Sequence, residues 1–223
     1  MFCIPIISSD TEEAIQKIRK AEPSADIFEV RLDLMDNFDL RRIINSSRRP
    51  LIITYRSETE GGSGTADPET IADYLVKGAK AGANYVDVEF SMAPSWRNKI
   101  LSSIDKNRVI ISTHINDRTP PRKELFDIFR KSTETGAGII KIVTLAHNWE
   151  DNLRILELIP AAKEKNIKII AFCMGSKGKI SRIMSILMGS FIGFSSIKEG
   201  EESASGQIPI SEMKRFLEYF TSC

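Results

Sequence analysis

The chain has 223 residues, of which 42% are hydrophobic and 27% charged, and its formal net charge is +1. This composition is typical of a globular protein with enough apolar material for a sizeable core. The near-neutral charge gives no electrostatic footprint for nucleic acid or for an anionic membrane surface, so we expect neither as a partner.

The N-terminal stretch Met1 to Ile7 is apolar, but it has no basic leader and is too short for a signal peptide or a membrane span. We therefore expect a cytoplasmic protein. The cysteines Cys3, Cys173 and Cys223 lie far apart and form no metal-binding motif, so reduced thiols are expected. With only two histidines in the chain, no zinc site is expected, and no sequence motif indicates a cofactor.

Short apolar runs recur along the chain, and each precedes a helical pattern. The predicted strands are 2–7, 27–32, 51–55, 85–90, 109–113, 139–143, 167–172 and 191–194. Strict alternation of strand and helix indicates parallel strands with helical crossovers, and units of about 28 residues match one βα unit. The sequence therefore predicts an α/β protein, a closed (β/α)8 TIM barrel that forms one catalytic domain over residues 1–223. An open doubly wound sheet is the alternative, but the glycine fingerprint usual after its first strand is missing from Ser8-Ser9-Asp10-Thr11.

Helix boundaries can be predicted from capping residues. The first helix is predicted to begin at Asp10, with Glu13 completing a capping box. Another begins at Asp67-Pro68 and ends at Ala81-Gly82. The helical patterns nearer the C-terminus have predicted apolar faces that include Leu153, Ile180, Phe216 and Phe220.

The sixth predicted strand, within Gly138 to Thr144, is apolar on both faces except for Lys141. A strand without a water-facing side is typical of a central parallel strand, so we expect Lys141 to be buried. Burial disfavours the ammonium form and leaves a neutral, nucleophilic amine. The alternative, commoner for a lone lysine near a strand, is a side chain that extends outward to water.

Charged residues gather at the ends of the predicted strands, where a barrel has its active site. Glu29, Arg31 and Asp33 alternate with apolar residues, so all three are predicted to share the interior face of the mouth. The further polar side chains at these ends are Arg56, Glu60, Asp87, Glu89 and His114. The alternative interpretation is a buried ion network with a structural role, and a lone histidine near a core is usually structural.

Two later connections add cations and a long loop. The segment 174–182 resembles a phosphate loop only superficially, because its spacing is too short and no Ser or Thr follows Lys179. The planar guanidinium of Arg182 is suited to a carboxylate instead. Residues 198–209 form a long polar connection, which we interpret as a lid over the site or else as a disordered surface loop.

A buried lysine, a nearby histidine, carboxylates and several arginines suggest imine chemistry on a small anionic carbonyl compound. The amine condenses with a ketone, and the resulting iminium makes an adjacent proton removable by a base such as histidine. Aldol cleavage and elimination of water share this machinery, so residue types alone leave both reactions open.

The motifs that carry a family resemblance are Glu29-x-Arg31, Tyr55-Arg56-Ser57, Glu60-Gly61-Gly62, Ser112-Thr113-His114, Lys141-Ile142-Val143, Gly175 to Arg182, and Ser203-Ala204-Ser205-Gly206-Gln207-Ile208. Together, and in this order, they closely resemble the type I 3-dehydroquinate dehydratases. These are (β/α)8 enzymes of the shikimate pathway. The resemblance covers nearly the whole chain.

The resemblance implies that Lys141 forms a Schiff base with the ketone of 3-dehydroquinate. His114 would remove the proton from carbon 2 and then protonate the departing carbon 1 hydroxyl, giving 3-dehydroshikimate and water by syn elimination. Glu60 would hold and polarise His114, and Arg182 would pair with the substrate carboxylate. The residues implied to hold hydroxyl groups are Glu29, Arg31 and Arg56, and those implied to close from the lid are Ser203 and Gln207. Because members are commonly dimers, a homodimer is expected.

Two features depart from the family pattern. The chain begins at its first predicted strand, without the N-terminal hairpin that closes the barrel bottom in many relatives, so different packing is expected there. Ser205 stands where many members have a proline, so the stiffness of the lid is expected to differ.

Two alternative functions compete with the dehydratase. A class I aldolase-type enzyme on the same fold would need a glycine-rich phosphate grip after the eighth strand, and Ser195 to Glu199 contains none. A non-catalytic descendant would lack at least one of Lys141, His114 and Arg182, and all three are present.

Overall fold

The computed structural model describes residues 1–221, so Cys223 and the thiol expected there lie outside the described residues. The strands are β1 (Phe2–Ile6), β2 (Ile27–Arg31), β3 (Leu51–Thr54), β4 (Tyr85–Glu89), β5 (Val109–Ile115), β6 (Ile139–Leu145), β7 (Lys168–Met174) and β8 (Gly193–Phe194). The α-helices are α1 (Thr11–Ala21), α2 (Leu40–Ser46), α3 (Pro68–Lys80), α4 (Pro94–Ser103), α5 (Arg122–Thr133), α6 (Glu150–Leu156), α7 (Leu158–Glu164), α8 (Lys179–Met188) and α9 (Ile210–Thr221). Within residues 1–221, no helix combines the length and apolarity needed to cross a membrane.

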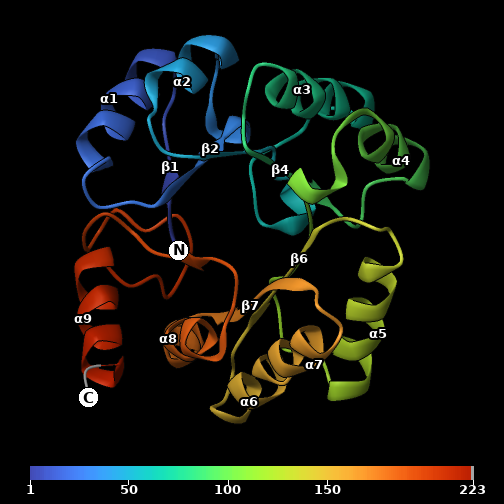
Figure 1. Cartoon of the computed structure of the whole chain (residues 1–223), viewed down its shortest axis with the longest axis vertical. Coiled ribbons are helices and arrows are strands. Elements are labelled where there is room, and N and C mark those ends of the chain that lie inside the picture. The colour runs from blue at the N-terminus through green and yellow to red at the C-terminus, as the bar shows by residue number, and fades with distance from the viewer. Residues whose placement is uncertain (222–223) are drawn as a thin grey trace.

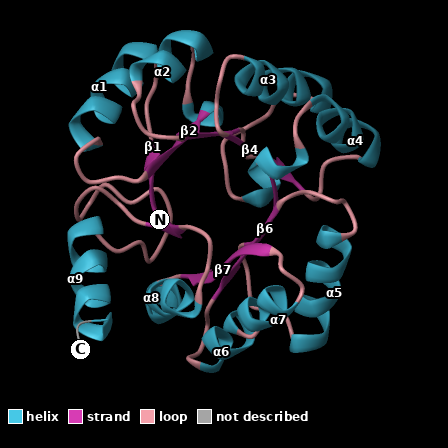
Figure 2. Cartoon of the chain, in the orientation of Figure 1, coloured by secondary structure: helices cyan, strands magenta, loops and turns pink. Residues whose placement is uncertain are grey.

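The strands form one parallel sheet that curves into a nearly closed barrel with the helices around it (Figure 1, Figure 2). The strand order is β7-β6-β5-β4-β3-β2-β1-β8, and no ladder joins β7 to β8 in the described part of the chain. The seam is bridged by a backbone bond from Phe191 N–H to the Ile169 carbonyl at 2.7 Å, and by the rings of Phe172 and Phe194, with centroids 6.1 Å apart. The predicted single-domain barrel is confirmed, with an eighth strand shorter than expected.

Capping residues determine where the helices begin. The Asp10 side chain accepts the backbone N–H of Glu13 at 2.9 Å, so α1 begins as predicted. The return bond of the predicted capping box goes to the N–H of Ser9, at 2.7 Å, rather than to that of Asp10. Asp67 likewise caps α3, and Gly82, with φ +112°, follows its end. These bonds satisfy backbone donors that the first helical turn leaves free.

Two apolar layers result from the alternation of side chains along the strands. Outward-facing residues such as Ile4, Ile53 and Val88 pack against the helices. Inward-facing residues such as Ile52 and Ile170 fill the lower barrel interior. Polar side chains replace apolar ones on the interior face toward the C-terminal ends of the strands, so the polar part of the barrel lies at its mouth.

Aromatic side chains occupy the N-terminal, bottom end of the barrel. The rings of Tyr85 and Phe191 pack edge to face with centroids 6.0 Å apart. The Lys168 ammonium lies 4.9 Å from the centroid of the Phe191 ring. The chain therefore packs its barrel bottom with these side chains, on the face where the sequence led us to expect different packing.

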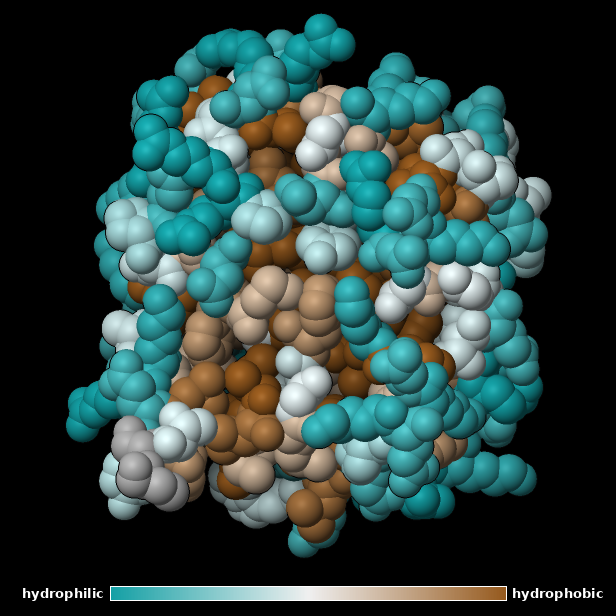
Figure 3. All heavy atoms as spheres, viewed as in Figure 1, coloured by the Kyte–Doolittle hydropathy of each residue, from teal (hydrophilic) through white to brown (hydrophobic). Residues whose placement is uncertain are grey.

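Several predicted apolar faces are wrong in detail. Leu153 is 65% exposed and Ile180 is 47% exposed, and Phe216 and Phe220 are also exposed on α9. The residues of α8 that are buried are instead Ser181, Arg182 and Ser185. Figure 3 shows hydrophobic residues reaching the surface around α8, within a largely hydrophilic rim. Hydrophobic periodicity identifies the apolar side of a helix, but the fully buried residues of α8 are polar, and one of them, Arg182, lines the site.

Candidate active site

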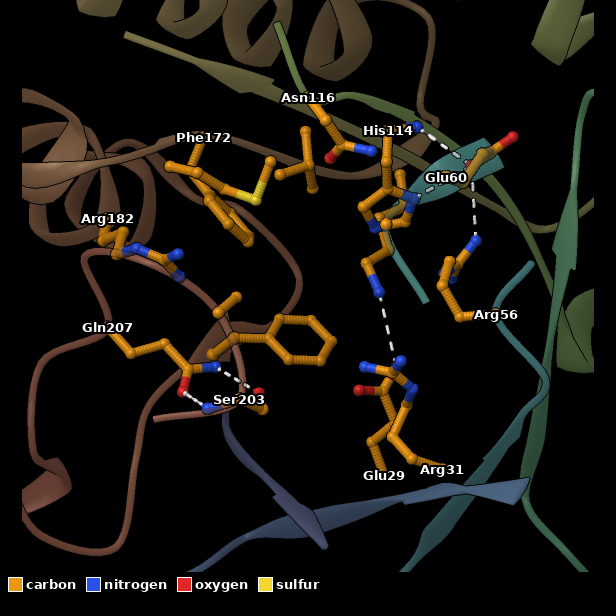
Figure 4. A pocket seen from close by; sticks show the side chains of 16 residues that line it. Glu29, Arg31, Arg56, Glu60, His114, Asn116, Phe172, Arg182, Ser203 and Gln207 are labelled. Atoms are coloured by element: carbon orange, nitrogen blue, oxygen red, sulfur yellow. Dashed lines mark hydrogen bonds and ion pairs between the residues drawn. The ribbon is translucent and has the colours of Figure 1, made fainter. Parts of the chain in front are cut away.

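One cavity opens at the C-terminal ends of the strands, and all the site residues predicted from the sequence line it (Figure 4). They are Glu29, Arg31, Arg56, Glu60, His114, Lys141, Arg182, Ser203 and Gln207. The space between the side chains, including its open mouth, is about 550 Å³. This volume is in the range of sites for small molecules.

Lys141 extends from β6 into the barrel interior and is only 4% exposed. Its Nζ lies 3.1 Å from Asp87 Oδ2 and 3.4 Å from Glu29 Oε1. The face of the Phe194 ring lies 4.3 Å from the same nitrogen. The lysine is therefore buried as predicted, and the outward-pointing alternative is wrong. Two carboxylates contact the amine, and its predicted neutral state stays a prediction.

His114, on β5, contacts Glu60, which belongs to the short helix after β3. The ring nitrogen Nδ1 lies 3.1 Å from Glu60 Oε2, which also accepts the His114 backbone N–H at 3.0 Å. The other oxygen, Oε1, accepts the Ser91 hydroxyl at 2.6 Å. Burial, only partly offset by the charge of Arg56, raises the pKa of Glu60 to about 7. Burial and the charges of Arg56 and Lys141 lower the pKa of His114 well below its ordinary value, which favours the neutral imidazole.

Arg56 is the centre of the buried ion network beneath the cavity. Its Nη2 lies 2.7 Å from Asp87, and its Nη1 lies 3.0 Å from Glu89, 3.3 Å from Glu60 and 3.0 Å from the Ser112 hydroxyl. Burial would lower the pKa of Arg56, but the surrounding carboxylates outweigh it and raise the pKa. The guanidinium thus holds three carboxylates together.

Arg31 and Glu29 approach the cavity from β2. The guanidinium of Arg31 makes a fork with the Asp33 carboxylate, with Nε at 2.8 Å and Nη2 at 2.6 Å. Glu29 Oε1 accepts the Thr54 hydroxyl at 3.0 Å in addition to its contact with Lys141. Asp33 lies in a 3-10 helix after the strand, so it orients Arg31 from beside it instead of continuing the predicted ladder. A planar fork of this kind holds an arginine in one orientation.

Arg182 enters the cavity from α8 and is 2% exposed. Its Nη2 donates to the Ser205 carbonyl at 3.1 Å, and its guanidinium lies 4.5 Å above the Phe172 ring. Within residues 1–221, its Nε and Nη1 have no hydrogen-bond partner. Burial lowers the pKa of Arg182 to about 9. A buried guanidinium with unused donors is suited to an anionic ligand that reaches the cavity.

The connection from β8 to α9 covers one side of the cavity. Gln207 accepts the Ser203 backbone N–H at 2.8 Å and donates to the Ser203 hydroxyl at 2.9 Å. The Ser205 carbonyl accepts the Gly175 N–H at 3.1 Å. Gly206 has φ +78°, and a Cβ there would lie 2.2 Å from the Gly175 carbonyl oxygen. The loop is therefore packed closely against the end of β7, and of the two sequence interpretations the lid agrees with this packing.

Comparison with known proteins identifies the family of this chain. A profile of the type I 3-dehydroquinase family matches residues 2–222. The chain belongs to this family. It is 36% identical over 223 residues to the 3-dehydroquinate dehydratase of Methanococcus maripaludis (strain C5), an alignment that covers 98% of this chain and 99% of the relative. The enzyme of the same name from Methanocaldococcus jannaschii is 34% identical over 219 residues, with 96% of each chain covered.

A solved structure of the family has the same fold. The type I 3-dehydroquinate dehydratase of Clostridium difficile, determined with covalent modified comenic acid, superposes with a TM-score of 0.86 at 26% identity. The match covers 98% of this chain and 91% of the other. These findings do not favour the aldolase-type alternative.

The sequence predicted no role at the site for Asp87, Ser112 or Ser91, although it placed Asp87 at a strand end. Asp87 and Glu89 form a charged alternation on β4, and Ser112 stands two residues before His114 on the interior face of β5. The alternation of side chains along a strand could therefore have predicted that Asp87 and Ser112 face the barrel interior. What the sequence did not contain is the distance between β4 and β6, which decides that Asp87 reaches Lys141.

Proposed function

We propose that this protein is a 3-dehydroquinate dehydratase of the shikimate pathway, which converts 3-dehydroquinate into 3-dehydroshikimate and water through an imine on Lys141. Family membership supports the reaction. The observation that carries the mechanism is a buried lysine amine in one cavity with a neutral histidine and an incompletely paired arginine. These three groups match the ketone, the acidic C–H bond and the carboxylate of this substrate.

The charges of the cavity support one orientation of the substrate. Glu29 and Asp87 contact the amine of Lys141, whereas Arg182 lies on the opposite side of the cavity from Glu60 and Arg56 (Figure 4). The carboxylates of Glu29 and Asp87 repel the substrate carboxylate, and Arg182 attracts it. The ketone therefore faces Lys141 when the carboxylate pairs with Arg182.

In this mechanism the Lys141 nitrogen adds to the ketone carbon, and loss of the oxygen as water leaves an iminium. His114 takes a proton from carbon 2, and the electron pair of that C–H bond moves to form an enamine. The enamine nitrogen then shares its lone pair again to restore the iminium. The electrons of the enamine double bond form the new double bond between carbons 1 and 2, and the carbon 1 hydroxyl, protonated by His114, leaves as water. Hydrolysis of the imine then releases 3-dehydroshikimate and restores the amine.

The remaining residues orient these groups. Glu60 accepts the Nδ1 hydrogen of His114 in one tautomer and leaves Nε2 as the basic nitrogen. Arg31 is held by Asp33, and with Glu29 and Arg56 it binds the substrate hydroxyls. The lid residues with this role are Ser203 and Gln207, which close over the ring.

The covalent step is tested by borohydride reduction of the protein in the presence of 3-dehydroquinate, followed by peptide mass mapping. We expect the reduced adduct on the peptide that contains Lys141. The exposed Lys168, at the opposite end of the barrel, is an internal control that should stay unmodified. The Lys141→Ala variant should keep its fold by circular dichroism and should neither form the adduct nor turn over substrate. An unmodified Lys141 peptide during active turnover would refute the mechanism.

We also propose that the protein is a cytoplasmic homodimer. The family resemblance supports both statements. Sedimentation equilibrium at micromolar concentration is the test of the dimer, and a mass equal to one chain would contradict it.

A further inference from the structure

Asp87 lies beneath the cavity and contacts the amine that carries the proposed chemistry. The side chain is 1% exposed and is not among the residues that line the cavity. Its Oδ1 accepts Arg56 Nη2 at 2.7 Å and the Ser112 hydroxyl at 2.5 Å. Its Oδ2 lies 3.1 Å from Lys141 Nζ. Two partners hold one oxygen in place, so the other is aimed at the lysine from below.

The carboxylate of Asp87 is ionised at any working pH. Burial alone would raise the pKa of Asp87, but the charges of Arg56 and Lys141 and the bond from Ser112 outweigh it, so the pKa lies below its ordinary value. Glu29 also contacts the amine, but at 3.4 Å, and it lines the cavity, where a substrate can approach it. Asp87 is thus the closer carboxylate of the two, and it lies outside the lining of the cavity.

We propose that Asp87 is a further catalytic residue, the counter-ion that keeps the Lys141 imine protonated. This inference rests on the proposed function. After water leaves the carbinolamine, the nitrogen lone pair forms the C=N bond, and the iminium retains one N–H and one positive charge. That N–H donates to Asp87 Oδ2. A neutral imine withdraws electrons poorly, so proton removal by His114 requires the charged form.

The charged and titratable groups around this nitrogen determine how its protonation responds to pH. Besides Asp87 they are Cys3, Glu29, Arg31, Arg56, Glu60 and His114. Arg56 is already paired with carboxylates, and burial raises the pKa of the Cys3 thiol well above its ordinary value, so that thiol is neutral. Loss of the Asp87 charge therefore acts directly on the nitrogen.

The test is the Asp87→Asn variant, which keeps the size of the side chain. We expect kcat to fall about 100-fold, the order seen when one preorganised stabilising group is removed. The KM for 3-dehydroquinate should change little, because Asp87 does not line the cavity. The alkaline limb of the kcat profile should move about one pH unit or more toward acid, since an opposite charge at this distance stabilises a cation by that amount.

Glu89→Gln is the matched control. Glu89 is on the same strand, is also buried and also pairs with Arg56, at 3.0 Å, but its other contact is with Ser57 rather than with Lys141. This variant should leave the alkaline limb where it is. A wild-type alkaline limb in Asp87→Asn, or the same displacement in Glu89→Gln, would overturn the assignment.

Ser112→Ala is the second variant if Asp87→Asn does not fold, because it keeps the carboxylate but removes one of the two bonds that hold Oδ1. We expect a smaller loss of kcat with an unchanged KM, and a wild-type kcat would count against the proposal. Turnover by the unmodified protein is measured first. If the wild type does not dehydrate 3-dehydroquinate, the proposed function fails together with this inference. If the wild type is active and Asp87→Asn equals it, only the inference fails.

Discussion

The guanidinium of Arg182 is buried, and the described residues satisfy only part of its hydrogen-bonding capacity. A buried guanidinium costs free energy unless its donors are paired, and here two of its nitrogens lack partners within the described residues. The pKa of Arg182, lowered to about 9, has the same physical origin. A substrate carboxylate would supply both the charge and the hydrogen-bond acceptors that the fold omits.

This imbalance predicts opposite effects of Arg182→Met on binding and on stability. Loss of the charge-assisted bonds should raise KM for 3-dehydroquinate roughly 10- to 100-fold. The midpoint of thermal unfolding should stay the same or rise, because a buried and incompletely paired charge is replaced by an apolar side chain of similar length. Steady-state kinetics and a thermal melt give the two readouts.

Arg118→Met is the control at the residue scale. Arg118 pairs with Glu124 at 2.9 Å on the exposed surface, where such pairs contribute little. Neither KM nor the melting temperature should change appreciably. A wild-type KM in Arg182→Met would remove this arginine from carboxylate binding.

At the scale of the elements, the loop from β8 to α9 owes its position to close backbone contact. Gly206 lies against Gly175 at a distance that no side chain would permit, and the Ser205 carbonyl bonds both Gly175 and Arg182. The lid is thereby connected to the residue proposed to hold the substrate carboxylate. Correct placement of Ser203 and Gln207 depends on that contact.

Gly206→Ala should therefore disturb the lid while the barrel stays folded. The new Cβ would meet the Gly175 oxygen at 2.2 Å, so the loop must move. A displacement of about 1 Å at a site can cost about 100-fold in rate, and we expect a fall of that order in kcat/KM. Limited proteolysis of the loop should become faster.

Gly200→Ala separates this clash from backbone strain. Gly200 lies in the same loop with a similar φ of +82°, but a Cβ added there would meet no atom of the described residues within 4 Å. The Gly200→Ala variant has the strain of a left-handed backbone at a residue with a side chain, about 1 kcal/mol, but no clash. Its kcat/KM should therefore stay close to that of the wild type. Equal losses in both variants would contradict the contact with Gly175 as the cause.

At the scale of the whole molecule, the barrel separates stability from chemistry along its axis. Apolar and aromatic residues fill the N-terminal end, whereas the charged residues lie at the C-terminal end. Such a division lets one end of the barrel stabilise the fold without contact with the reaction. Tyr85, Phe191 and Lys168 form the bottom contact.

Phe191→Ala should lower stability and leave the kinetics unchanged. Phe191 packs against Tyr85 and the interior apolar layer, so we expect the free energy of unfolding to fall by about 2 kcal/mol, with KM unchanged. Phe216→Ala, on the exposed side of α9, should cost less than about 1 kcal/mol. Denaturant unfolding compares the two, and a raised KM in Phe191→Ala would contradict the division.

Local sequence patterns were enough to predict the order of the elements and the burial of Lys141. Period-two and helical repeats predicted the order of strands and helices, and the apolar strand around Lys141 predicted its burial, because both depend on residues close together in the chain. The same patterns failed for Leu153 and Ile180, since amphipathicity does not say what a helix packs against. Tertiary structure alone decided that Asp87 reaches Lys141 past β5 and that Gly206 meets Gly175. It also decided that two nitrogens of Arg182 find no partner among residues 1–221. These are distances between segments far apart in sequence, and strand register and barrel closure determine them.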